Sequence, residues 1–136
     1  MTAIMTLRTA VRLTRPFTLL PPLLGIVSGA VCAFGSVHNP DPEHRLTWAV
    51  VAAIALGSLC ASFLNAASNV LNQITDLEVD RVNKPDRPLV TGEASLRETW
   101  VLTWLLYALA MLPVWFVVVP PPEGLSARPL APLGPH

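Results

Sequence analysis

The chain has 136 residues, of which 52% are hydrophobic and 13% charged, and nine basic residues balance nine acidic ones. With a mean hydropathy of +0.52, this composition excludes an ordinary soluble domain and indicates a membrane protein. The balanced charge gives no reason to expect nucleic acid as a partner. Cys32 and Cys60 lie in apolar runs without metal-ligand spacing, so we expect neither a metal site nor a disulfide from them.

The first predicted membrane helix covers about residues 16–35. It follows Arg8, Arg12 and Arg15, as the apolar core of a signal peptide would follow its basic end. The uncharged run is longer than such a core, so we expect a retained membrane helix. The Pro21–Pro22 pair predicts that this helix either kinks there or begins only after the prolines.

Two further spans are predicted, over about residues 46–75 and 99–119, each long enough to cross the hydrocarbon core. Basic residues gather before the first span and between the second and third, which predicts a cytoplasmic N-terminus and a cytoplasmic loop at 76–98. We therefore expect an all-α integral membrane protein with three transmembrane helices, in the plasma membrane if the source is prokaryotic. Six of the fourteen prolines lie in 120–136, which predicts a disordered tail.

The second span carries a polar face. At about 100° per residue, seven polar side chains share a wedge of about 80° on the helix. They are Ser58, Ser62, Asn65, Asn69, Asn72, Asp76 and Asp80. Such a face is costly against lipid and must point to other helices or to a water-filled cavity. For the first four of these residues we favour hydrogen bonds between helices.

The last three positions of the wedge, Asn72, Asp76 and Asp80, are spaced four residues apart, so successive turns stack them. Neighbouring carboxylates repel unless a cation lies between them, and Mg²⁺ prefers hard oxygen ligands such as these. The alternative is that both aspartates lie in the interfacial zone at the helix end and pair with Arg81 or Lys84. The negative end of the helix dipole disfavours bare carboxylates there, which suggests a compensating cation.

Three basic residues follow at once: Arg81, Lys84 and Arg87. The arginine fork and the lysine charge both suit phosphate oxygens. As isolated charges they would only mark the cytoplasmic side of the membrane. Beside an acidic pair of the metal-binding type they favour a phosphate site, and Pro85 and Pro88 stiffen the loop that carries them.

At these residues the chain resembles the UbiA-type intramembrane prenyltransferases. The first aspartate-rich motif of that family, Asn-x-x-x-Asp-x-x-x-Asp, reads NQITDLEVD here, and NKPDRPLVTG follows it after two residues. The segment RLTRPFTLLPPLLG, residues 12–25, resembles the start of the family's first helix. The resemblance covers about residues 1–119, or about three helices. It implies an N-terminal part of a larger helical bundle.

The resemblance also implies a function, the Mg²⁺-dependent transfer of a prenyl group from an isoprenoid diphosphate to an aromatic or lipid acceptor. It implies that Asn72, Asp76 and Asp80 act in catalysis by holding the metal. The implied diphosphate-binding residues are basic: Arg15, Arg81, Lys84 and Arg87. The expected partners are therefore a prenyl diphosphate, a hydrophobic acceptor, membrane lipid and further helices that complete the bundle.

The second acidic motif of such enzymes has no counterpart here, because Glu123 is the only acidic residue after Glu98. We therefore expect the front portion of a larger enzyme, as a truncated or frameshifted form would give. The alternative is a non-catalytic small membrane protein, or inactive fragment, whose polar wedge binds partner helices. A cation-transport fragment is disfavoured, because the first and third spans carry no acids deep in the membrane.

Overall fold

The computed structural model describes residues 5–39, 41, 43 and 45–116, and the regular elements of this part of the chain are all helical. This confirms the all-α fold. The elements are α1 (Leu7–Thr14), the 3-10 helix η1 (Pro16–Leu19), α2 (Leu20–Phe34), α3 (Trp48–Thr75), α4 (Leu77–Asn83), α5 (Pro88–Thr91) and α6 (Leu96–Phe116). The predicted tail at 120–136 and residues 117–119 of the third predicted span lie outside the described residues.

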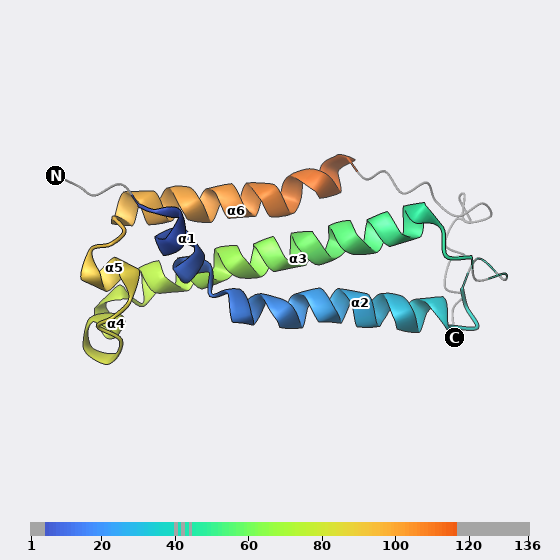
Figure 1. Cartoon of the computed structure of the whole chain (residues 1–136), viewed down its shortest axis with the longest axis horizontal. Helices are drawn as coiled ribbons and strands as arrows, with labels where there is room; N and C mark the ends of the chain where they lie inside the picture. The colour runs from blue at the N-terminus through green and yellow to red at the C-terminus, as the bar shows by residue number, and fades with distance from the viewer. Residues whose placement is uncertain (1–4, 40, 42, 44, 117–136) are drawn as a thin grey trace, which may run out of the picture.

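The three long helices run side by side, with α3 between α2 and α6 (Figure 1). The short elements α1, α4 and α5 gather at one end, where α2 begins, α3 ends and α6 begins (Figure 1). The N-terminal helix and the 76–98 segment therefore lie at the same end of the molecule. That both lie on the cytoplasmic side of a membrane stays a prediction.

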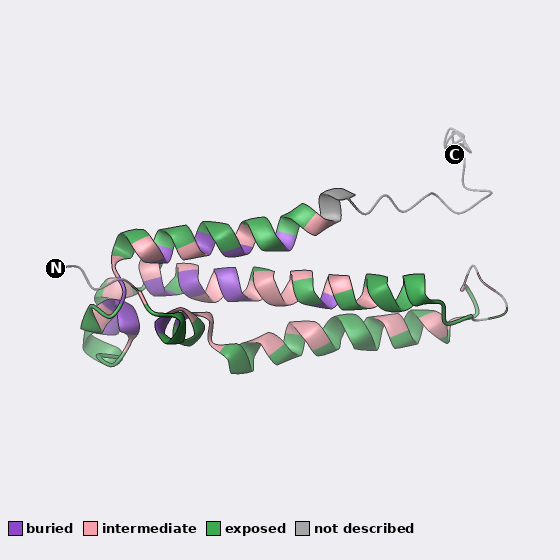
Figure 2. Cartoon of the chain, turned by 45° about the horizontal axis from the view of Figure 1, so that its top comes forward, coloured by how far each residue is buried: buried purple, intermediate pink, exposed green. Residues whose placement is uncertain are grey.

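Within the described residues, two helical segments are long and apolar enough to cross a membrane, Pro16–Phe34 and Trp48–Thr75, each with a mean hydropathy of 1.9. In the most apolar 18-residue window of each segment, none of the first and 17% of the second is buried. Figure 2 accordingly shows α2 as exposed or half-buried along its whole length. Exposed apolar helices of this length are typical of helices that lie against lipid or against further apolar helices. The third span corresponds to α6 and remains a prediction.

The two prolines of the first span lie in the first turn of α2, which begins at Leu20. The helix therefore does not begin after Pro21 and Pro22. In the first turn their missing N–H groups have no intrahelical acceptor in any case, and the fixed φ of proline suits a helix start.

The core lies where α3 meets α6 and α1, and half of its buried members are alanines. Its buried members are Leu13, Ala66, Ala67, Val70, Ala94 and Leu106. Small residues allow helix backbones to approach closely. Thr99 and Thr103 of α6 are also fully buried, and each hydroxyl donates to the carbonyl four residues earlier, at 2.8 and 2.9 Å. These bonds satisfy the two hydroxyls without a partner helix.

Candidate functional site

The chain turns sharply at Arg15, between α1 and η1. Arg15 has φ 52° and ψ 71°, in the left-handed region, and its N–H donates to the Arg12 carbonyl. A residue with a side chain pays about 1–2 kcal/mol for this conformation. Such strain gathers at functional sites, where the surrounding structure holds it in place. The turn sets α1 across the end of the long helices (Figure 1).

The turn leaves carbonyls at the end of α1 without helical partners, and α3 supplies donors for them. Gln73 Nε2 donates to the Leu13 carbonyl at 2.8 Å. Asn69 Nδ2 donates to the Thr14 carbonyl at 3.0 Å and to the Thr18 hydroxyl at 2.7 Å. These side-chain amides fix the strained turn to α3.

We predicted hydrogen bonds between helices for the polar wedge, and its first two asparagines make them. Asn69 bonds to Thr14 and Thr18, and Asn65 Nδ2 donates to the Thr18 carbonyl at 2.6 Å. Ser62 donates to the Ser58 carbonyl of its own helix at 2.9 Å. The buried Ser58 hydroxyl is the one described buried side-chain oxygen or nitrogen without a partner. Sequence reasoning missed Gln73, although it lies about 80° from Asn65, at the edge of the wedge.

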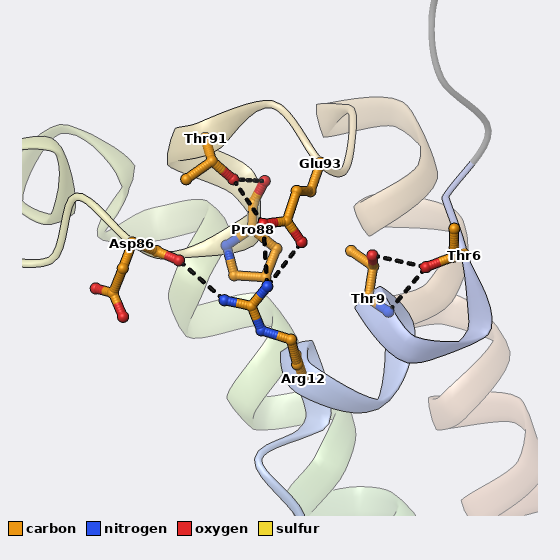
Figure 3. A network of polar contacts seen from close by, with 7 residues as sticks. All are labelled: Thr6, Thr9, Arg12, Asp86, Pro88, Thr91 and Glu93. Carbon is orange, nitrogen blue, oxygen red and sulfur yellow. Dashed lines mark hydrogen bonds and ion pairs between the residues drawn. The ribbon is translucent and has the colours of Figure 1, made fainter.

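An arginine of α1 clamps the segment that follows α4 (Figure 3). Arg12 Nη1 donates to both carboxylate oxygens of Glu93, at 3.0 and 2.7 Å, and Nη2 donates to the Asp86 carbonyl at 3.1 Å. The Thr91 hydroxyl donates to the Pro88 carbonyl at 3.3 Å and lies 3.4 Å from the Glu93 carboxylate. The clamp therefore joins α1 to both sides of α5.

Between α1 and the segment from α4 to α5 lies an open cavity of about 570 Å³, here called the cationic cavity. Its lining residues are Val11, Arg12, Arg15, Pro16, Phe17, Gln73, Lys84, Asp86, Arg87 and Pro88. Three predicted diphosphate-binding residues, Arg15, Lys84 and Arg87, thus meet in one place. Arg12 was not predicted, although its position three residues before Arg15 could have suggested it.

The fourth predicted diphosphate-binding residue, Arg81, does not line the cationic cavity. Its side chain is 58% exposed and donates to Glu78 of the same helix, α4, at 2.9 Å. An exposed pair one turn apart contributes little to stability. Arg81 is therefore a surface residue outside the assembled site.

The helix changes direction within the acidic motif. Asp76 separates α3 from α4 and has φ −92° and ψ 8°. The backbone bonds nevertheless continue across it, from Asp76 N to the Asn72 carbonyl at 2.9 Å and from Asp80 N to the Asp76 carbonyl at 2.8 Å. The side chains differ sharply, because Asn72 and Asp76 are exposed whereas Asp80 is 2% exposed.

The buried Asp80 carboxylate is paired with two cations of the loop that follows it. Its Oδ2 accepts a hydrogen bond from Arg87 Nη1, and its Oδ1 lies 3.9 Å from Lys84 Nζ. The side chains of Asp80 and Arg87 are 3% and 10% exposed. Of the two partners in the predicted alternative, Arg81 pairs with Glu78 and Lys84 comes only within 3.9 Å of Asp80. The hydrogen-bonded partner of Asp80 is Arg87, which that alternative did not name.

The residues of the motif fit Mg²⁺ unequally. Among the described residues, no three acidic, histidine or cysteine side chains gather into a metal-binding group. Mg²⁺ often takes only one or two carboxylates and completes its shell with water and substrate phosphate. The exposed Asn72 and Asp76 offer oxygens of this kind, although neither residue lines the cationic cavity. The Asp80 oxygens already face Arg87 and Lys84 and do not fit the ion.

Comparison with known proteins gives a consistent set of relatives. The model of the UbiA prenyltransferase family matches residues 19–125. A 2-acylphloroglucinol 4-prenyltransferase of Humulus lupulus is 35% identical over 92 residues, 65% of this chain and 20% of the relative. A chloroplastic coumarin 8-geranyltransferase 1 of Citrus limon is 29% identical over 80% of this chain and 25% of the relative.

A third relative matches this chain over a larger share of its own length. The digeranylgeranylglyceryl phosphate synthase of Thermococcus gammatolerans is 33% identical over 79% of this chain and 35% of the relative. The chain thus spans 20 to 35% of the length of these three relatives. No solved structure matches it.

Proposed function

The chain belongs to the UbiA prenyltransferase family, and on that premise we propose that it binds an isoprenoid diphosphate in the cationic cavity. The bound diphosphate serves the Mg²⁺-dependent transfer of its prenyl group to an aromatic or lipid acceptor. The acceptor classes follow the names of the relatives, which include an acylphloroglucinol, a coumarin and a glyceryl phosphate lipid.

The observation that carries this proposal is the meeting of Arg15 with Lys84 and Arg87 in one cavity, although Arg15 lies far from both of them in the sequence. Glu93 already pairs with Arg12, and Asp80 pairs with Arg87. Arg15 forms no ion pair with any described residue, and Lys84 has only the 3.9 Å approach to Asp80. These two cations are therefore the ones most available to an incoming anion.

The cavity suits both ends of a prenyl diphosphate. Arg15 and Lys84 supply N–H donors and positive charge for the phosphate oxygens. The apolar side of the cavity, with Val11, Pro16 and Phe17, lies just before α2, whose exposed apolar surface suits an isoprenoid chain.

The chemistry needs a stabilised leaving group and a dry pocket. As the allylic carbon–oxygen bond breaks, negative charge grows on the departing diphosphate, and fixed cations stabilise it there. A Mg²⁺ ion held by Asn72 and Asp76 would supply further charge stabilisation. The allylic cation then reacts with the acceptor only if water is excluded. The apolar helices α2 and α3 supply that exclusion.

The proposal is tested by measuring how a prenyl thiolodiphosphate, an anionic analogue that does not release its prenyl group, binds to the protein in lipid nanodiscs. Replacing Arg15→Gln or Lys84→Gln removes a charged hydrogen bond, so we expect affinity to fall by about 10- to 100-fold. Arg81→Gln is the matched control, because Arg81 lies outside the cavity, and it should bind like the wild type. Absence of binding by the wild-type chain, or an equal loss in Arg81→Gln, contradicts the proposal.

The alternative function, a non-catalytic protein that binds partner helices through its polar wedge, has less support. Asn65, Asn69 and the neighbouring Gln73 use their side-chain amides on the chain's own backbone at the α1 turn. Those donors are therefore engaged within the chain. A partner-binding face would have to be built from other residues.

A further inference from the structure

We propose that Asp80 is a positioning residue that holds Arg87 in the wall of the cationic cavity, and that it is not a ligand of the metal. This assignment rests on the proposed function for its meaning in catalysis. Its structural part, the dependence of Arg87 on Asp80, stands independently of any substrate.

The three members of the acidic motif share one spacing but occupy two environments. Asn72 and Asp76 are open to solvent, where a hydrated cation can approach. None of these three side chains lines the cationic cavity, but that of Asp80 is 3% exposed and pairs with Arg87, which does line it. The motif therefore divides into an outward pair suited to a metal and one inward carboxylate suited to a cationic side chain.

Burial makes the Asp80–Arg87 pair costly to separate. A metal ion could use the Asp80 oxygens only by displacing Arg87, whose side chain is 10% exposed. The guanidinium would then be buried without a counter-charge, which is far less favourable than keeping the pair intact. The 3.9 Å approach of Lys84 to the second oxygen adds a further positive charge where a metal would have to sit.

The pair also fixes the backbone that carries Arg87. The Asp80 carbonyl accepts the Lys84 N–H at 2.8 Å, and the Arg87 carbonyl accepts the N–H groups of Val90 and Thr91, both at 2.9 Å. Arg87 is thus the N-cap residue of α5, which begins at Pro88. The side-chain bond between the two residues closes the segment that links α4 to α5.

This arrangement leaves Arg87 able to bind an anion. Asp80 takes only Nη1 of the guanidinium, which has five N–H donors in a rigid plane. The remaining donors have no partner among the described residues and are left for phosphate oxygens in the cavity that Arg87 lines. Asp80 acts through Arg87, as the carboxylate that sets its orientation before substrate binds.

The first experiment needs no substrate. Thermal unfolding in nanodiscs is measured for Asp80→Asn, Arg87→Gln and the double variant, with and without Mg²⁺. Each single change leaves one buried group without its partner, so we expect each midpoint to fall by about 5 °C or more. The double variant should be clearly more stable than the sum of the two losses predicts, and Mg²⁺ should change none of these differences. Additive losses overturn the assignment.

The second experiment separates the roles of the two aspartates. The Mg²⁺ concentration that gives half-maximal binding of the thiolodiphosphate is measured for Asp76→Asn, Asp80→Asn and Arg87→Gln. Loss of a metal ligand should raise it by about tenfold or more in Asp76→Asn. Asp80→Asn should stay within about twofold of the wild type and lose analogue affinity to the same extent as Arg87→Gln.

An increase in the Mg²⁺ requirement of Asp80→Asn that equals that of Asp76→Asn shows Asp80 to be a ligand and overturns the proposal. If the wild-type chain binds no analogue, the proposed function fails, and the unfolding cycle still decides whether Asp80 holds Arg87.

Discussion

Arg12 and Glu93 are 81 residues apart in the sequence, yet the guanidinium donates to both oxygens of the carboxylate, at 3.0 and 2.7 Å (Figure 3). A third bond, to the Asp86 carbonyl, completes the clamp. One wall of the cationic cavity comes from α1 and the other from the segment around α5. The bonds of Arg12 to Glu93 and Asp86 therefore join the two sides directly.

Removing the clamp should loosen α1 more than it destabilises the fold. Both side chains are over 40% exposed, so we expect Glu93→Gln to cost only about 0.2–1 kcal/mol. The amide hydrogens of residues 7–14 should then exchange faster in hydrogen–deuterium exchange. Glu78→Gln is the control, since it breaks a bond of similar length within a single helix. Equal exchange in both variants would show that the clamp does not hold α1.

Gln73 should matter more than its lack of charge suggests. It is 3% exposed and donates to the Leu13 carbonyl at the strained turn. In Gln73→Leu that carbonyl loses its donor in a buried place, which costs about 1–3 kcal/mol. Thermal unfolding measures the loss. Ser58→Ala is the matched control, because its buried hydroxyl has no partner to lose and the change should not destabilise the protein. The reverse order of stability contradicts this account.

Arg15 should trade stability for binding. Glycine adopts the left-handed conformation of residue 15 without a steric penalty, whereas alanine does not. Arg15→Gly should therefore be more stable than Arg15→Ala, with a free energy of unfolding higher by about 1 kcal/mol. Both variants lack the cation and should bind the diphosphate analogue equally weakly. If Arg15→Ala is the more stable variant, then residue 15 is not strained.

Stability should depend on pH through Glu98, in the first turn of α6. The backbone N–H of Met5 and the backbone N–H and hydroxyl of Ser95 donate to its carboxylate, and they hold its pKa below the ordinary value of 4.5. Because the folded pKa is lowered, the stabilisation is complete above pH 4.5 and is lost as the pH falls through the folded pKa.

The Glu98 contribution is measured as the difference in unfolding midpoint between the wild type and Glu98→Gln. Above pH 4.5 the wild type should be the more stable of the two. As the pH falls below that value, the difference should shrink. A difference that stays constant across this range contradicts a role for the ionised carboxylate.

The sequence predicts several residues of the site but not the groups that they contact. The spacing of the polar wedge correctly indicated hydrogen bonds from Asn65 and Asn69, since helical periodicity decides which side chains share a face. It could not name the acceptors, because those carbonyls become available only through the left-handed turn at Arg15. Gln73 was missed for the same reason.

The basic residues show the same division. Their charge and order along the chain predicted a phosphate site with Arg15, Arg81, Lys84 and Arg87. The chain reversal after α3 then brought three of them into the cationic cavity and left Arg81 on the surface with Glu78. Neighbours in sequence can thus have different roles, because a short loop points successive side chains in different directions.

The amino-acid sequence by itself determined the apolar helices, because their length and hydropathy are local properties. A helix also satisfies its backbone hydrogen bonds within its own segment. The sequence also determined which polar residues lie one turn apart. Only the tertiary structure decided that Asp80 turns inward to Arg87 while Asp76 stays exposed. Asp80 is buried because the following loop folds back over α4 and brings Arg87 to it. How strongly this charge pair is desolvated depends on all the residues packed around it.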